Sequence, residues 1–217
     1  TADVVLDASE DAADDLGQRA ETLGEILPGH VVYLVLTEDL GLGSLARLYG
    51  RLSQFAKVWI GYLANYSVGE ACFEVSTGAG QSAPSLPISL KLLQLIETRA
   101  VYAQGDAGVI TMAMAASLLN AAEELCLTGT PVSAVDQAII DLGLTAGPFQ
   151  WADYYGLDAF LSQNARLPAE FRQPLEITRS LLGAITDSKA TPEFYLSAGE
   201  RDGLPNPDAT RVIQELR

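Results

Sequence analysis

A continuous helical pattern between Gly108 and Asp158 constrains the fold of this chain more than any other feature. Its first segment is long and apolar, and the pattern is broken at three glycine-containing sites: Thr128-Gly129, Leu142-Gly143 and Gly147-Pro148-Phe149. Glycine just after a helical period is typical of a helix C-terminus, because it adopts left-handed backbone conformations without steric cost. Proline suits the first turn of the helix that follows. The stretch therefore predicts consecutive helices joined by short turns.

The helical periodicity continues to the end of the chain. It predicts helices over residues 108–127, 132–142, 148–155, 157–163 and 174–184. The first of these is apolar on nearly all sides from Val109 to Leu125, and its polar residues gather at Asn120, Glu123 and Glu124. A helix that faces water should carry a polar stripe. We therefore expect most of this helix to be buried against neighbouring helices, the first half of the chain or another chain.

The first half of the chain has a different pattern. Short β-branched and apolar runs predict strands at 3–8, 30–36, 57–62, 71–76 and 100–102, and helices at 9–27, 44–49 and 87–97. Strand, helix and strand in this order form a βαβ unit. The composition shifts near Gln104-Gly105-Asp106. We therefore predict an α/β unit over residues 1–105 and an all-α unit over residues 106–217.

The net charge of the chain disfavours some classes of binding partner. The formal net charge is −15, from 28 acidic and 13 basic side chains. Such a surface disfavours nucleic acid and makes a tight CoA or dinucleotide site harder to build. The plainer interpretation is a solvated acidic surface that aids solubility.

The remaining bulk features indicate a cytoplasmic protein outside the membrane. No run reaches the roughly 18 consecutive apolar residues of a membrane span, because the richest run, Val109 to Leu119, contains Thr111 and Ser117. No signal peptide is visible. Cys72 and Cys126 have neither disulfide-framework nor metal-site spacing. We therefore expect no metal site.

The order of motifs in the helical half resembles the C-terminal domain of the L-3-hydroxyacyl-CoA dehydrogenase family, whose signature runs PGFIxNR…EA…G…DID.A…LG…GPFEL.D..GLD. The chain matches it at Gly147-Pro148-Phe149 and Gly156-Leu157-Asp158. A weaker resemblance covers the first half, in four segments: residues 2–8 with ADLVIEA, 31–46 with the SNTSS segment, 54–56 with RFxGxHFFNP, and 188–195 with GRKTGxGFY. The family's GxGxMG turn has no counterpart here. The resemblance implies a reduced, incomplete Rossmann-like unit followed by the family's helical domain.

The resemblance also implies that the family's reactive positions are altered. Its catalytic base is the His of HFFNP, which corresponds to Trp59, and indole has no basic nitrogen. The substrate-binding Ser of SNTSS corresponds to Glu38, whose carboxylate would repel a developing alkoxide. The Asn and Arg of PGFIxNR correspond to Met112 and Ala113. No catalytic residue is intact at these positions, and no cofactor-binding residue is identified.

One family carboxylate has a candidate match. The Glu of the LVEV run, which orients the catalytic His, corresponds to Glu74 if three extra residues precede it, and Glu70 is the alternative. A carboxylate without its histidine has nothing to orient. His30, the only histidine, is better explained as a surface or capping residue. Trp59 and Met112 are in turn better explained as core residues, and Glu38 as a loop or helix-capping residue.

The resemblance thus implies that the chain keeps residues that the family needs for folding and lacks the residues that it needs for catalysis. Tandem members of the family, including the phenylacetate-pathway type that acts on 3-hydroxyadipyl- or 3-hydroxybutyryl-CoA, carry a second copy with a reduced Rossmann unit. We expect this chain to be such a non-catalytic C-terminal module of an NAD-dependent parent enzyme, inactive by itself. It would support the acyl-CoA pocket and form a homodimer through its helical domain.

Two alternatives remain at this point. The chain could be a free-standing acyl-CoA-binding or protein-interaction module without a dehydrogenase partner. It could also be an active enzyme with relocated catalytic residues.

Overall fold

The structure is a computed structural model of the 217-residue chain. It describes residues 4–7, 22, 25, 32–37, 58–64, 72–76, 85–95, 99–103, 109–184, 192–196 and 203–217. The chain divides into two compact units, Thr1–Thr111 and Met112–Arg217. The boundary predicted between residues 105 and 106 lies outside the described residues and stays a prediction.

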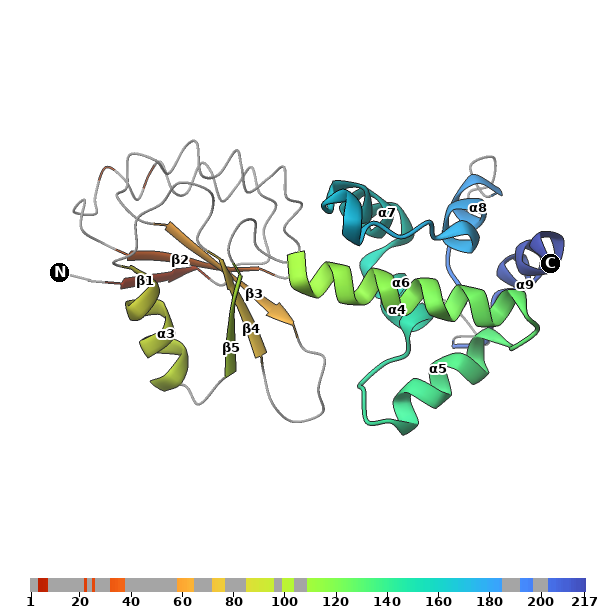
Figure 1. The fold of residues 1–217 in the computed structure, drawn as a ribbon, viewed down its shortest axis with the longest axis horizontal. Helices are drawn as coiled ribbons and strands as arrows, with labels where there is room; N and C mark the ends of the chain where they lie inside the picture. Colours follow the sequence, from red (N-terminus) through yellow and green to blue (C-terminus); the bar gives the residue numbers. More distant parts are fainter. Residues whose placement is uncertain are drawn as a thin grey trace. The chain divides into compact units, whose positions relative to one another are not determined.

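The first unit contains a five-stranded sheet (Figure 1). Its elements are β1 (Val4–Asp7), β2 (Val32–Thr37), β3 (Val58–Ala64), β4 (Cys72–Ser76), α3 (Ser85–Leu95) and β5 (Arg99–Ala103). The strand order is β1-β2-β3-β4-β5, and α3 packs against β3 and β5. Strands β1, β2 and β3 are mutually parallel, as a βαβ unit requires. All five strands lie where the sequence predicts them.

Strand β4 departs from the parallel arrangement. It is antiparallel to β3, with Tyr62 opposite Glu74, and β5 is then parallel to β4. Only residues 65–71 separate β3 from β4. A parallel crossover needs a dozen or more residues. Because this connection is shorter, it permits only the antiparallel pairing. Of the helix predicted over residues 9–27, the structure describes Thr22 and Glu25, both helical, and residues 44–49 lie outside the described ones.

The second unit is helical. Its first helix, α4, begins at Val109, within the first unit. The elements follow in this order: α4 (Val109–Leu127), α5 (Val132–Asp141), α6 (Pro148–Tyr155), α7 (Leu157–Arg166), the 3-10 turn η1 (Ala169–Phe171), α8 (Glu176–Ala184) and α9 (Pro207–Leu216). Neighbouring helices pack in the pairs α5–α6, α6–α7, α7–α8 and α8–α9. The α/β-then-helical fold class predicted from the sequence is confirmed. The last helix, α9, and the 3-10 turn η1 were not predicted.

Aromatic side chains form much of the core of the helical unit. The Phe149 and Phe194 rings lie 4.6 Å apart, and both side chains are fully buried. The Trp151 ring lies 4.4 Å from Tyr155 and 5.6 Å from Phe160. Pairs at these tilted and edge-on geometries stabilise a core beyond their buried area. This cluster joins α6 and α7 to the chain segment that carries Phe194.

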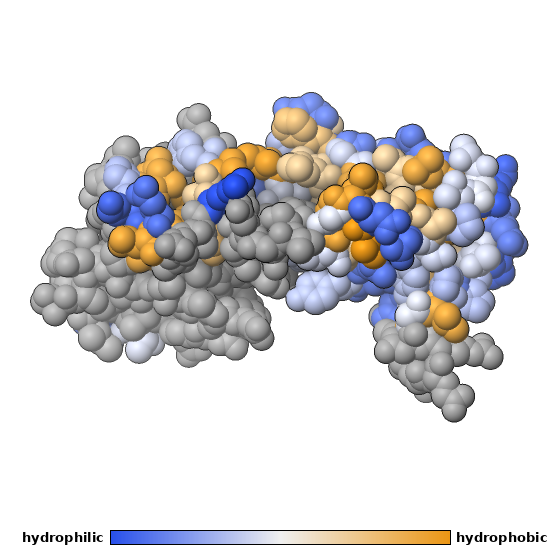
Figure 2. All heavy atoms as spheres, turned by 90° about the horizontal axis from the view of Figure 1, so that it is seen from below, coloured by the Kyte–Doolittle hydropathy of each residue, from blue (hydrophilic) through white to orange (hydrophobic). Residues whose placement is uncertain are grey.

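Helix α4 carries apolar residues on an exposed side as well as on its buried side. Its buried face includes Ala116, Leu119 and Cys126, but Met114 is 63% exposed and Leu125 is 50% exposed. Figure 2 shows hydrophobic residues at the surface of the helical unit among hydrophilic ones. Within the single chain, this side of α4 is thus left exposed, and its expected burial against another chain stays a prediction.

By length and mean hydropathy alone, α4 is long and apolar enough to cross a membrane, although polar residues interrupt its apolar run. Its most apolar window is 44% buried in the structure, and core helices of soluble proteins pass the same test.

Candidate functional site

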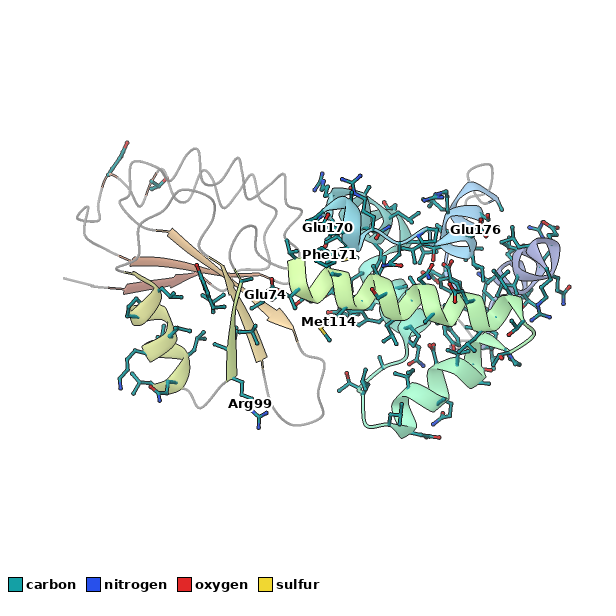
Figure 3. All side chains as sticks on the ribbon, in the orientation of Figure 1. Glu74, Arg99, Met114, Glu170, Phe171 and Glu176 are labelled. Carbon is teal, nitrogen blue, oxygen red and sulfur yellow. The ribbon has the colours of Figure 1, made fainter. Side chains whose placement is uncertain are left out.

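Glu74 is the family-related carboxylate whose surroundings the structure describes. It lies on β4 and is only 3% exposed. Its Oε1 accepts a hydrogen bond from the Ile110 N–H at 3.1 Å, and its Oε2 accepts one from the Thr111 N–H at 2.9 Å. Both amides belong to the first turn of α4, and Figure 3 shows Glu74 beside this turn. Glu74 therefore caps the N-terminus of α4.

This geometry gives the Glu74 carboxylate a structural role at the start of α4. The first amides of a helix have no partner within the helix, and the positive end of the helix dipole favours an anion there. A buried amide without a partner would destabilise the fold by about 1–3 kcal/mol. Glu74 satisfies two such amides at once. Its contacts are those of a structural residue.

Met112 follows directly after the capped amides. It is buried, at 7% exposure, and its predicted correspondence to the asparagine of the family motif stays a prediction. A thioether donates no hydrogen bond, so Met112 contributes packing where the family's residue would contribute a polar contact.

The other predicted site residues are described less completely. Trp59 lies on β3, paired in register with Leu34, and its side chain lies outside the described part of the structure. Glu38, Glu70 and His30 also lie outside the described residues. The assignment of these positions stays a prediction.

A second carboxylate, Glu123 of α4, caps another helix. It accepts hydrogen bonds from the Ile177 N–H at 3.0 Å, the Thr178 N–H at 2.8 Å and the Thr178 hydroxyl at 2.5 Å. These amides belong to the first turn of α8, where the preceding residue, Leu175, has no side-chain acceptor. Leu175 has φ +47°, a left-handed conformation that costs about 1–3 kcal/mol for a residue with a side chain. Burial raises the pKa of the Glu123 carboxyl.

Asp136 of α5 has the same role for α6. It accepts hydrogen bonds from the Phe149 N–H at 3.0 Å, the Gln150 N–H at 3.1 Å and the Tyr195 hydroxyl at 2.8 Å. Its carboxylate presses against Gly147, where a Cβ atom would lie 2.2 Å from the Asp136 Cγ. Burial raises the pKa of Asp136. The glycine of the Gly-Pro-Phe motif thus makes room for the carboxylate that caps the helix beginning at Pro148.

Asp153 of α6 binds a different kind of segment. It accepts hydrogen bonds from the N–H groups of Phe194 and Tyr195, each at 2.8 Å. Burial, with smaller contributions from Glu193 and Asp136, raises the pKa of Asp153 to about 7. Burial and the hydrogen bond to Asp136 also raise the pKa of the Tyr195 hydroxyl.

The carboxylates of Glu74, Glu123, Asp136 and Asp153 therefore each bind two backbone N–H groups of another segment. Among the described residues, no group of three or more His, Cys, Asp or Glu side chains is placed to hold a metal ion. The sequence analysis considered Glu74 only as a retained catalytic-site carboxylate and gave Asp136 and Asp153 no role. The available signal was the Asp-Tyr-Tyr-Gly-Leu-Asp run of residues 153–158, in which Asp153 precedes Gly156 by three residues.

Known proteins share sequence features and the fold of this chain. Residues 108–191 match the family model of the 3-hydroxyacyl-CoA dehydrogenase C-terminal domain. This part of the chain is thus similar to the C-terminal domain of that family. No curated protein matches the chain.

Solved structures share the fold at low sequence identity. A 3-hydroxybutyryl-CoA dehydrogenase from Escherichia coli has 17% identity and a TM-score of 0.63, over 85% of this chain and 40% of that protein. An (S)-3-hydroxybutyryl-CoA dehydrogenase from Ralstonia eutropha has 18% identity and a TM-score of 0.60, over 84% and 65%. The dehydrogenase part of a multifunctional enzyme from C. elegans has 14% identity and a TM-score of 0.54, over 99% and 49%. The chain thus spans 40–65% of these proteins.

Proposed function

We propose that this chain is a C-terminal, non-catalytic module of an NAD-dependent 3-hydroxyacyl-CoA dehydrogenase that degrades fatty or aromatic acyl-CoA. The observation that carries the proposal is the match of residues 108–191 to the family's C-terminal domain, joined to a sheet unit in which Glu74 caps a helix. The resemblance in fold and the backbone contacts of Glu74, Glu123, Asp136 and Asp153 support a structural role.

The reaction of the family requires groups that this sequence does not offer. Oxidation of a 3-hydroxyl needs a general base, polar groups around the developing alkoxide, and NAD as hydride acceptor. The corresponding positions hold Trp59, Glu38 and Met112, and the sequence has no GxGxMG turn to present amides to a pyrophosphate. We therefore assign no NAD site to this chain. The nucleotide site and the catalytic base would belong to a first half of the same polypeptide.

The module would then act as a cytoplasmic scaffold. In this role its helices support the acyl-CoA pocket of the parent and form the contact between two copies. The exposed apolar stripe of α4, which includes Met114 and Leu125, supports the second part of this role. A C2 homodimer is the commonest symmetry among soluble oligomers.

The test begins with the reading frame that encodes the segment. We expect a dehydrogenase unit with a GxGxMG turn upstream of Thr1 in the same frame. The purified protein of the whole frame should reduce NAD with 3-hydroxybutyryl-CoA, and residues 1–217 alone should not. A frame without the nucleotide-binding unit would contradict the proposal, and acyl-CoA binding by such a product would favour the free-standing module instead.

A Glu74→Gln variant of the whole protein separates structure from chemistry. A capping role predicts a lower melting temperature with an unchanged pH–rate profile, because Gln keeps one acceptor oxygen and loses the other. A shift of the acidic limb of the profile would instead show that Glu74 orients a catalytic base.

A further inference from the structure

We draw no further inference here: the strongest candidate, the exposed apolar side of α4 that includes Met114, Ala121 and Leu125, is the surface already proposed for the contact between two copies, and nothing in the described part of the structure shows another partner that would cover it.

Discussion

At the scale of residues, backbone amides at helix starts are bound by carboxylates from other elements. Glu74, Glu123 and Asp136 bind the first amides of α4, α8 and α6, respectively. Local N-caps are usually Ser, Thr, Asp or Asn at the position before the helix. At α8 that position is the strained Leu175, and the remote carboxylate replaces the local cap. The stability of these helix starts therefore depends on tertiary contacts.

A substitution of Glu123 measures this dependence. Glu123→Gln places an amide group opposite one of the two α8 amides, so one buried hydrogen bond is lost. We expect a loss of about 1–3 kcal/mol in the free energy of unfolding, measured by urea denaturation. The neighbouring Glu124→Gln is the control, since Glu124 is exposed and bonds only Asn120. Its effect should stay within about 0.5 kcal/mol. Equal effects of the two variants would contradict the capping role.

These contacts could not be predicted from the sequence. Glu123 and Thr178 are 55 residues apart, and no local pattern connects a helix interior with a distant helix start. The sequence does indicate that Glu123 is unusual, because it interrupts an otherwise apolar helix. The altered family positions were predicted from the resemblance, and for Met112 the structure adds that the side chain is buried.

At the scale of elements, most helices and strands follow from periodicity and glycine breaks. The exception is α9, whose start carried the standard signals of Asn206 as N-cap and Pro207 at the first position. The sequence interpretation stopped at residue 184 and missed them. The antiparallel direction of β4 could have been predicted from the short β3–β4 connection. Local strand propensity alone does not indicate the direction of a strand.

The junction of α5 and α6 gives a prediction at this scale. Gly147 has φ −79°, which any residue adopts, so its role is steric. In a Gly147→Ala variant the Cβ would lie 2.2 Å from the Asp136 Cγ. We expect a loss of about 1–3 kcal/mol in the free energy of unfolding. Gly183→Ala in α8 is the matched control, because its Cβ meets nothing within 4 Å, and it should stabilise by about 0.5–1 kcal/mol. A neutral Gly147→Ala would show that Asp136 moves away freely.

The exposed stripe of α4 gives a second prediction. We expect the chain to be a dimer at tens of micromolar, with an interface above about 1,000 Å². Met114→Glu should convert it to a monomer in light scattering, because a charge would be buried without a partner. Ser133→Glu, at an exposed position of α5, is the control and should leave the dimer intact. A monomeric unmodified chain would disprove the prediction, and a dimeric Met114→Glu variant would place the interface elsewhere.

At the scale of the whole molecule, the charge distribution limits its ligands. The chain carries a net charge of −15 and no glycine turn of the dinucleotide-binding type. We expect NAD to bind with a dissociation constant of about one millimolar or weaker, since the sequence lacks the glycine turn that presents backbone amides to a pyrophosphate and the net charge repels one. Isothermal calorimetry measures this directly. A micromolar dissociation constant would show that a nucleotide site exists that the sequence does not reveal.

The two tryptophans give each unit its own optical probe. Trp59 belongs to the sheet unit, and Trp151 lies in the aromatic cluster of the helical unit, against Tyr155 and Phe160. A Trp59→Phe variant therefore leaves an emission that reports only on the helical unit, and Trp151→Phe leaves one that reports only on the sheet unit. The two units can thus be followed separately during unfolding, and any difference between their midpoints would give the degree to which they fold as one cooperative body.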